Sequence, residues 1–280
     1  MASPLGSGGI GVQQLIDIGA NLTHDSFADD LDEVVGRAIG AGISRFIVTG
    51  SSEKGSQDAF DLARQHPGIM YATAGVHPHH ASEYCQRVEH MLSELLHNEA
   101  VVAVGECGLD YFRNFSPVEA QRHAFSAQLD LAVASNMPIF LHQRDAHDDF
   151  LEILSPAMQH ISHAVAHCFT GTATMLREYL DLGLYIGITG WICDERRGAL
   201  LQEIVSEIPL DRLMLETDAP YLLPRSLQPP PKSRRNEPAY LTEVLRVVAA
   251  CTGHSETEIA TVTTQNAARF FNFQAPQSTP

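Results

Sequence analysis

Six of the eight short apolar runs in this sequence end in, or are closely followed by, residues able to bind a metal ion or transfer a proton. These residues are Asp17 in QLIDIG, His77 after MYATAGV, Glu106 in VVAVGE, His142 in PIFLH, His167 in HAVAH, and Glu216 and Asp218 in RLMLETD. The other two runs end in Thr49-Gly50 and Thr189-Gly190, which leave room for a ligand. The pattern predicts one polar site built from several strands.

A carboxylate on a buried strand is costly unless it is paired or bound to a cation, and Glu106 closes an otherwise apolar run. His142 and His167 supply imidazoles from two successive runs, so we expect all three residues to hold a divalent metal. Such a site accepts Mg²⁺, Mn²⁺ or Zn²⁺, and its carboxylates favour Mg²⁺. Asp218 either completes the coordination or acts as general base towards water, and Glu216 either orients another ligand or is structural.

Short β-rich runs alternate with amphipathic helical patterns along the whole chain. The runs span 14–19, 45–50, 70–76, 101–106, 138–142, 163–167, 184–190 and 212–217, and helical patterns are clearest over 27–42, 116–136 and 172–183. This alternation predicts an α/β fold, a (β/α)₈ TIM barrel, with a doubly wound sheet as the alternative. In such a barrel the site lies at the C-terminal ends of the strands, where the polar residues fall.

We expect a single barrel domain over residues 13–272, because no linker divides the alternation. The small, polar stretches 1–12 and 273–280 are predicted to be flexible tails. The long basic segment 221–238 is predicted to be a functional loop after the eighth strand.

Seven arginines fall in loops predicted to follow strands and are candidates to bind phosphate through paired hydrogen bonds. They are Arg113, Arg144, Arg196, Arg197, Arg225, Arg234 and Arg235. Aromatic residues in the same loops either stack on nucleobases or pack within the loops; these are Tyr111, Phe112, Phe115, Phe169, Trp191 and Tyr221. His79 and His80 are expected to be loop histidines.

The composition argues against several classes of protein. A net charge of −16 is unsuited to coating nucleic acid through a general positive field, so a polyanionic substrate must meet a local basic patch. The two lysines, Lys54 and Lys232, do not lie at strand ends, which disfavours Schiff-base aldolases and lysine-bridged binuclear amidohydrolases. Five cysteines without a CxxC pair and no membrane-spanning apolar run favour a cytoplasmic protein with no membrane partner.

The sequence resembles the TatD family of metal-dependent deoxyribonucleases from about Leu15 to Phe271. The resemblance is carried by the blocks DIGANLT, AGVHPHH, VGECGLDYFRNFS, QRDAH, HCFTGT, YIGITGWICDERRG, ETDAPYLLPR and RRNEPAYL. It implies a TIM barrel with a divalent metal, usually Mg²⁺, and 3′ to 5′ exonuclease action on single-stranded DNA or RNA, with a role in repair of oxidised DNA. We expect the protein to act as a monomer.

The resemblance also implies roles for individual residues. Glu106, His142 and His167 match the family's metal ligands, Asp218 matches its catalytic aspartate, and His77 matches a histidine that contacts substrate or its phosphate. With these roles Asp218, His77 and Glu106 form the expected catalytic set, in which metal-activated water attacks a phosphodiester.

The first strand departs from many relatives, which carry an Asp-x-His-x-His block there. Gly19 and Asn21 occupy the two histidine positions in this chain. Asp17 and Asn21 offer only oxygen ligands, so a second metal bound there is expected to be weaker than the one on Glu106.

Two other functions remain as alternatives. One is an amidohydrolase acting on a small amide or lactone, which would be favoured by an intact histidine pair on the first strand and few arginines at the rim. The other is a non-catalytic phosphate or nucleic-acid binder, which would be favoured by broken ligand positions. The sequence shows the opposite features in both cases.

Overall fold

Eight strands form within residues 14–273, the part of the chain that this computed structural model describes, and each falls at one of the apolar runs. They are parallel, and each pairs with the next along the chain. The strands are β1 (Leu15–Ala20), β2 (Ile43–Val48), β3 (Met70–Ala74), β4 (Val101–Asp110), β5 (Ile139–Arg144), β6 (Ala164–Ala166), β7 (Tyr185–Ile188) and β8 (Leu213–Leu215). The predicted (β/α)₈ barrel is therefore confirmed.

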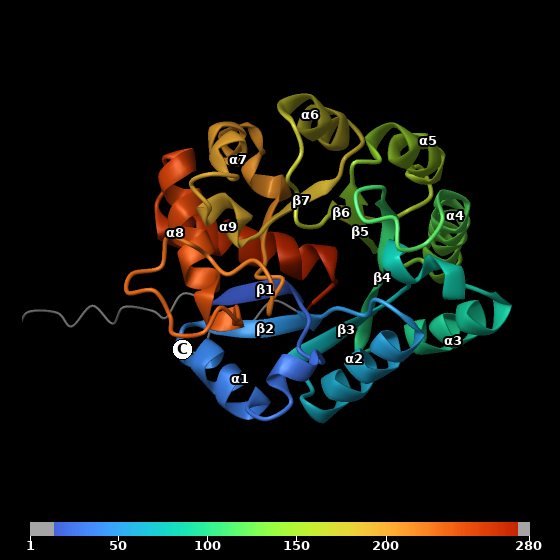
Figure 1. Cartoon of the computed structure of the whole chain (residues 1–280), viewed down its shortest axis with the longest axis horizontal. Helices are drawn as coiled ribbons and strands as arrows, with labels where there is room; N and C mark the ends of the chain where they lie inside the picture. The colour runs from blue at the N-terminus through green and yellow to red at the C-terminus, as the bar shows by residue number, and fades with distance from the viewer. Residues whose placement is uncertain (1–13, 274–280) are drawn as a thin grey trace, which may run out of the picture.

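Helices connect successive strands, and α1 to α8 form a ring around them (Figure 1). The α-helices are α1 (Leu31–Gly40), α2 (Glu53–Gln65), α3 (Gln86–Leu96), α4 (Val118–Ser135), α5 (His147–Ala157), α6 (Ala173–Asp181), α7 (Ala199–Ile204), α8 (Leu241–Thr252) and α9 (Glu256–Phe270). Short 3₁₀ helices are η1 (Asp25–Phe27), η2 (Pro78–Glu83), η3 (Gly190–Cys193), η4 (Val205–Glu207), η5 (Leu210–Arg212) and η6 (Pro238–Tyr240).

Backbone hydrogen bonds close the barrel between its first and last strands. The Asp218 amide donates to the carbonyl of Gly19 at 2.8 Å, and the Asn21 amide donates to the carbonyl of Ala219 at 2.7 Å. Ala20 and Ala219 form a parallel bridge at the same level. Closure therefore places the residues that follow β1 beside those that follow β8, at one rim.

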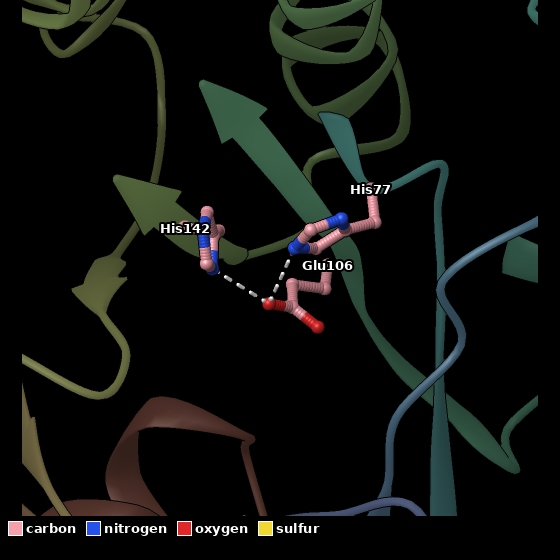
Figure 2. Close-up of side chains that lie close together, drawn as sticks. All are labelled: His77, Glu106 and His142. Atoms are coloured by element: carbon pink, nitrogen blue, oxygen red, sulfur yellow. Dashed lines mark ion pairs between the residues drawn. The ribbon is translucent and has the colours of Figure 1, made fainter. Parts of the chain in front are cut away.

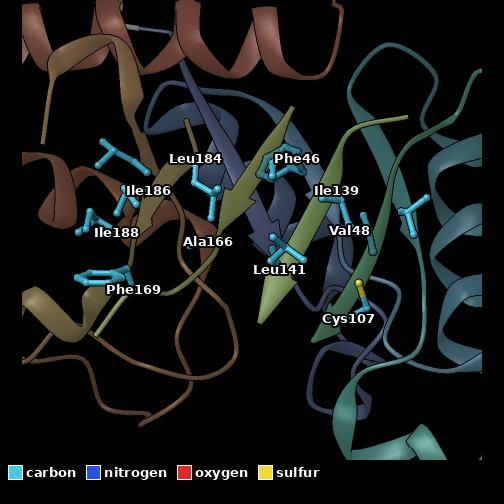
Figure 3. Packing of buried hydrophobic residues seen from close by; sticks show 14 of the residues in the cluster. Phe46, Val48, Cys107, Ile139, Leu141, Ala166, Phe169, Leu184, Ile186 and Ile188 are labelled. Atoms are coloured by element: carbon cyan, nitrogen blue, oxygen red, sulfur yellow. The ribbon is translucent and has the colours of Figure 1, made fainter. Parts of the chain in front are cut away.

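The core has two layers because successive strand residues face opposite sides of the sheet. Outward residues such as Ile139 and Leu141, which Figure 3 shows with part of their cluster, belong to a buried cluster that also contains helix residues such as Leu154 of α5. Inward residues such as Phe140, Val165 and Met214 belong to a separate buried cluster that includes Phe270 at the end of α9. Side chains fill the barrel, so a ligand can approach only from an end.

Every second residue of a strand points into the barrel, and beyond the apolar layer the next inward residues are polar. His142 follows Phe140 by two residues, His167 follows Val165, and Glu216 follows Met214. The same alternation that packs the barrel therefore directs these polar side chains to its C-terminal mouth.

The chain after β8 runs from residue 221 to 237 without helix or strand, as predicted for the long loop. Within residues 14–273, no helix is both long and apolar enough to cross a membrane. The predicted tail 1–12, and all of the predicted tail 273–280 except Phe273, lie outside the described residues. Phe273 packs against Tyr71 with a ring separation of 4.3 Å. The domain boundaries stay predictions.

Candidate metal centre and catalytic cavity

Three imidazoles meet one carboxylate oxygen at the C-terminal mouth of the barrel. Glu106 Oε1 lies 2.9 Å from His167 Nε2, 3.0 Å from His142 Nδ1 and 3.4 Å from His77 Nε2. Figure 2 shows His77, from the segment that follows β3, and His142, on β5, approaching the carboxylate. Glu106, His77 and His167 are buried and His142 is partly buried, so water solvates these groups poorly.

The charges in this cluster stabilise one another. Burial alone would raise the pKa of Glu106, but the neighbouring imidazoles of His167 and His77 hold that pKa well below its usual range. Burial would lower the pKa of His167, yet the carboxylates of Glu216 and Glu106 raise it well above the ordinary value. The buried carboxylate thus demands positive charge, which protons on imidazole or a bound cation can supply.

Two glycines let β4 approach β5 closely beside Glu106. A Cβ atom at Gly105 would lie 2.2 Å from the carbonyl oxygen of Phe140, and one at Gly108 would lie 1.9 Å from that of His142. Both glycines also have positive φ angles, of 123° and 140°. Any side chain at these positions would push the two strands apart and separate Glu106 from His142.

Glu216 lies behind His167 and is fully buried. Its Oε2 is 3.0 Å from His167 Nδ1, and its Oε1 accepts a 2.5 Å hydrogen bond from the Cys168 amide. The contact with Nδ1 orients the ring so that Nε2 faces Glu106, as carboxylates do behind metal-binding histidines. Of the two roles considered for Glu216, this geometry favours orientation of a ligand.

The space taken by Glu216 accounts for the departure at the first strand. A Cβ atom at Gly19 would lie 2.5 Å from Glu216 Oε2 and 3.0 Å from the ring of Phe140. Gly187 gives similar clearance on the other side, since its Cβ would lie 2.5 Å from Glu216 Oε1. A histidine at position 19 would therefore collide with the carboxylate that orients His167.

Asn21 and Asp218 contact each other where the barrel closes. The Asn21 amide Nδ2 donates to Asp218 Oδ1 at 2.9 Å. Burial, reinforced by the charge of Glu106, raises the pKa of Asp218 to about 7. Both residues line the same cavity as Glu106.

Asp17 makes its contacts elsewhere. It is fully buried, and its carboxylate accepts hydrogen bonds from Thr217 N at 2.9 Å, Thr217 Oγ1 at 2.5 Å and Gly19 N at 3.3 Å. The structure therefore gives Asp17 partners around Thr217, while it directs Asn21 towards Asp218.

The cavity at the barrel mouth has a volume of about 900 Å³. Its lining includes every residue of the predicted catalytic and metal-binding sets: His77, Glu106, His142, His167 and Asp218. The structure thus brings together, in one cavity, residues separated by up to 141 positions in the sequence.

The seven predicted phosphate-binding arginines separate into three groups. Arg113 and Arg144 line the cavity. Arg196, Arg197 and Arg225 surround the buried carboxylate of Asp194 at 3.6, 2.9 and 3.9 Å, and remain half exposed. Arg235 is held by Asp30 at 2.6 Å and by Glu237 at 2.9 Å, which gives it a structural contact, and Arg234 is not among the cavity-lining residues.

The polar cavity residues that sequence reasoning missed include His79 and Asp110, which contact each other. His79 Nε2 lies 2.7 Å from Asp110 Oδ2, and Asp110 is buried while it accepts a 2.8 Å hydrogen bond from the Arg113 amide. The signal for Asp110 was its spacing of four residues from Glu106, since even spacings share one face of a strand. His79 had no such signal, because η2 determines its direction.

The residues fit a divalent cation. His142 Nε2 is buried without a hydrogen-bond partner, and ligand atoms of His77, Glu106 and His142 lie within 4.8 Å of one another. His77 is the weaker ligand candidate because its Nδ1 accepts a hydrogen bond from the His79 amide at 3.1 Å, which leaves the proton on Nε2. Glu106 and His142 are common to this group and to the predicted ligand set, and His167 Nε2 lies 2.9 Å from the same Glu106 oxygen.

Comparison with known proteins points to one family. A family model described as "TatD related DNase" matches residues 16–272. A protein of Erwinia tasmaniensis named "3'-5' ssDNA/RNA exonuclease TatD" is 52% identical over 258 residues, which cover 92% of this chain and 100% of the relative.

Solved structures give the same result. A TatD homologue of Escherichia coli superposes with a TM-score of 0.85 at 28% identity, covering 95% of this chain and 100% of the other. A TatD-family hydrolase of Entamoeba histolytica gives a TM-score of 0.82 at 26% identity, with 94% and 99% coverage. The chain belongs to the family of TatD-related DNases.

Proposed function

We propose that this protein is a cation-dependent exonuclease that hydrolyses phosphodiester bonds of single-stranded DNA, and of RNA, from the 3′ end. The observation that carries the proposal is the convergence of His142 and His167 on Glu106 in the cavity that Asp218 also lines. The name of the Erwinia relative supports the polarity and the single-stranded substrate.

Glu106, His142 and His167 would hold the cation, with Mg²⁺ expected first and Mn²⁺ or Zn²⁺ as alternatives. When bound, the cation supplies a Lewis acid that polarises a phosphoryl oxygen and lowers the pKa of water. A weaker second cation at Asp17 and Asn21 receives less support, because Thr217 and Gly19 already engage both oxygens of Asp17.

In this proposal Asp218 accepts the proton of the attacking water. Its environment raises its pKa to about 7, close to neutral pH, where a general base is most effective. Asn21 holds one carboxylate oxygen at 2.9 Å, which orients the side chain.

In this proposal His77 donates a hydrogen bond to the phosphate. Burial lowers its pKa well below the usual value, so the ring is neutral, and the His79 amide fixes the proton on Nε2. Arg113 and Arg144 add positive charge where the cavity opens. These donors would stabilise charge that develops on phosphate oxygens in the transition state.

The biological setting is also part of the proposal. Resemblance to the family supports a role in repair of oxidised DNA. A cytoplasmic location and a monomeric state stay predictions. Faster removal of nucleotides from a 3′ end that carries an oxidised base, in extracts with the protein than in extracts lacking it, would support the repair role.

Labelled oligonucleotides test the proposal directly. With Mg²⁺, a 5′-labelled single strand should shorten progressively, whereas a 3′-labelled strand should release labelled mononucleotide at once. EDTA should abolish both reactions. Release of mononucleotide from the 5′ end, or no digestion with any of the three cations while amide or lactone substrates are hydrolysed, would contradict the proposal.

Two variants test the assigned residues. His142→Ala and Asp218→Asn should each slow digestion by at least about a hundredfold, because one removes a ligand and the other removes the base. His160→Ala and Asp211→Asn are matched controls, since both residues are exposed and outside the cavity lining. Parent-like rates in the first pair would refute the assignment.

A further inference from the structure

Two exposed phenylalanines lie together at the wall of the catalytic cavity. Phe112 is 54% exposed and Phe115 is 67% exposed, and both line the cavity. Of the 12 phenylalanines in the chain, all within the described residues, these are the two classed as exposed. They are three residues apart in the loop that joins β4 to α4, so their exposure is local to the site.

Hydrogen bonds from neighbouring segments hold both ends of this loop, which keeps the rings from folding back into the core. Gln121 of α4 is buried, accepts a hydrogen bond from the Asp110 amide at 2.8 Å and donates to the Ser116 carbonyl at 2.9 Å. Ser116 Oγ in turn donates to the His79 carbonyl at 3.0 Å. Both ends of the loop are thus fixed while the two phenylalanine rings stay exposed to solvent. Exposed rings forgo the stabilisation that burial of apolar surface gives, unless a ligand covers them.

The rings connect to the metal centre through other aromatic side chains. His142 and His77 have ring centroids 4.4 Å apart, His77 and His79 are 4.2 Å apart, and His79 and Phe115 are 4.7 Å apart. Each pair meets edge to face. Phe115 therefore lies beside His79, whose ring contacts His77, the predicted phosphate-contacting histidine. This position is within reach of a nucleotide next to the bond that is cut.

Positive charge flanks the same wall. The Arg144 guanidinium lies 3.9 Å from the ring centroid of Phe112, and that of Arg113 lies 5.7 Å away. Aromatic faces next to guanidinium groups match the alternation of base and phosphate along a single strand. A small amide or lactone substrate would not need this combination.

We propose that Phe112 and Phe115 form a stacking subsite for the nucleobase adjacent to the scissile phosphodiester, with Arg113 and Arg144 contacting the flanking phosphates. This inference rests on the proposed nuclease function and assigns its base-binding surface. Every base has a flat face, so the subsite accepts any sequence, whereas a duplex end keeps its bases stacked and paired. The subsite therefore selects unpaired 3′ ends.

Combining protein variants with abasic substrates tests the subsite. Phe112→Ala and Phe115→Ala should each raise KM for a single strand by about tenfold, with a smaller effect on kcat, since stacking binds the substrate more than it assists the chemistry. Phe115→Trp should retain parent-like KM. Ile39→Ala is the matched control, because Ile39 is 48% exposed on α1 and outside the cavity lining.

The abasic arm makes the test specific for stacking. Two abasic substrates each lack one of the two bases that flank the scissile bond. For the parent enzyme, one of these two substrates should raise KM by about the same factor as the alanine variants do. A substrate that is abasic at the fifth nucleotide should leave KM unchanged. At the flanking position where base removal raises KM, the effects of Phe115→Ala and base removal should not multiply, because they delete the same contact. Multiplying effects, or unchanged KM in both alanine variants, would overturn the subsite, whereas failure of the parent to digest any strand would instead overturn the proposed function.

Discussion

Replacing Glu216 by glutamine tests whether the buried carboxylate controls the affinity of the metal centre. The change keeps the side-chain volume but removes the charge 3.0 Å from His167 Nδ1. A hydrogen bond to a charged group is worth about 1.5–3 kcal/mol and a neutral one about 0.5–1.5 kcal/mol, so the loss is about 1–1.5 kcal/mol. This corresponds to about tenfold weaker cation binding, at the lower end of the 10- to 100-fold usual for such partners.

The geometry adds a second consequence. Glu216 accepts from both His167 Nδ1 and the Cys168 amide, whereas glutamine has one carbonyl oxygen and its NH₂ group cannot accept. One of the two buried donors must lose its partner, and the His167 ring should become less well oriented. Activity at limiting Mg²⁺ should therefore fall more than activity at saturating Mg²⁺.

Calorimetric titration of Mn²⁺ and digestion of a labelled strand over a range of Mg²⁺ concentrations measure both effects. Glu203→Gln, at an exposed position on α7, is the control for the change of charge. Circular dichroism should show that both variants fold. If Glu216→Gln bound Mn²⁺ as tightly as the parent and needed no more Mg²⁺ for half-maximal rate, the orienting role would be refuted.

Three further predictions concern stability, pH and the arginines. Gly19→Ala should lower the free energy of unfolding by about 1–3 kcal/mol, because the new methyl group overlaps with its neighbours. Gly36→Ala, in open space on α1, should raise the free energy of unfolding by about 0.5–1 kcal/mol. Urea denaturation measures both changes, and equal shifts would contradict the steric argument. The pKa of Asp218 is raised from 3.8 to about 7 in the folded protein, so between these pH values the folded state binds one more proton than the unfolded state. In EDTA, the contribution of Asp218 to stability should therefore decrease as pH rises from 4 to 7. Denaturation of Asp218→Asn should lack that decrease, and a pH profile identical to that of the parent would count against the raised pKa. Arg235→Ala should lower stability without changing KM for DNA. Arg144→Ala should raise KM for DNA and make KM depend less on salt concentration. The reverse pattern in steady-state kinetics would show that the structural and substrate-binding roles are misassigned.

The fold could be predicted from the sequence because the strands are buried on both faces. Runs such as VVAVGE and PIFLH are short and apolar, and their regular alternation with helices left few topologies. The candidate ligands followed from the same pattern, since a polar residue at the end of a buried strand faces the mouth of a barrel. Glu106, His142 and His167 were placed in this way.

Interactions between distant segments could not be predicted. Nothing near Gly19 in the sequence indicates that Glu216 occupies the space beside it, although a Cβ atom at Gly19 would lie only 2.5 Å from Glu216 Oε2. Arg235 appeared as suitable for phosphate as Arg144, and only the position of Asp30 separates their environments. His79 resembled an ordinary loop histidine because its contact with Asp110 depends on how two loops approach.

Diffraction from crystals grown with Mn²⁺ and a phosphorothioate dinucleotide would test the central claim most directly. An anomalous peak should lie about 2.0–2.4 Å from ligand atoms of Glu106, His142 and His167, with a phosphate oxygen of the dinucleotide in contact with it and Asp218 beside the phosphorus. A Mn²⁺ peak away from these three residues, or a dinucleotide bound outside the cavity that they share with Asp218, would contradict the account.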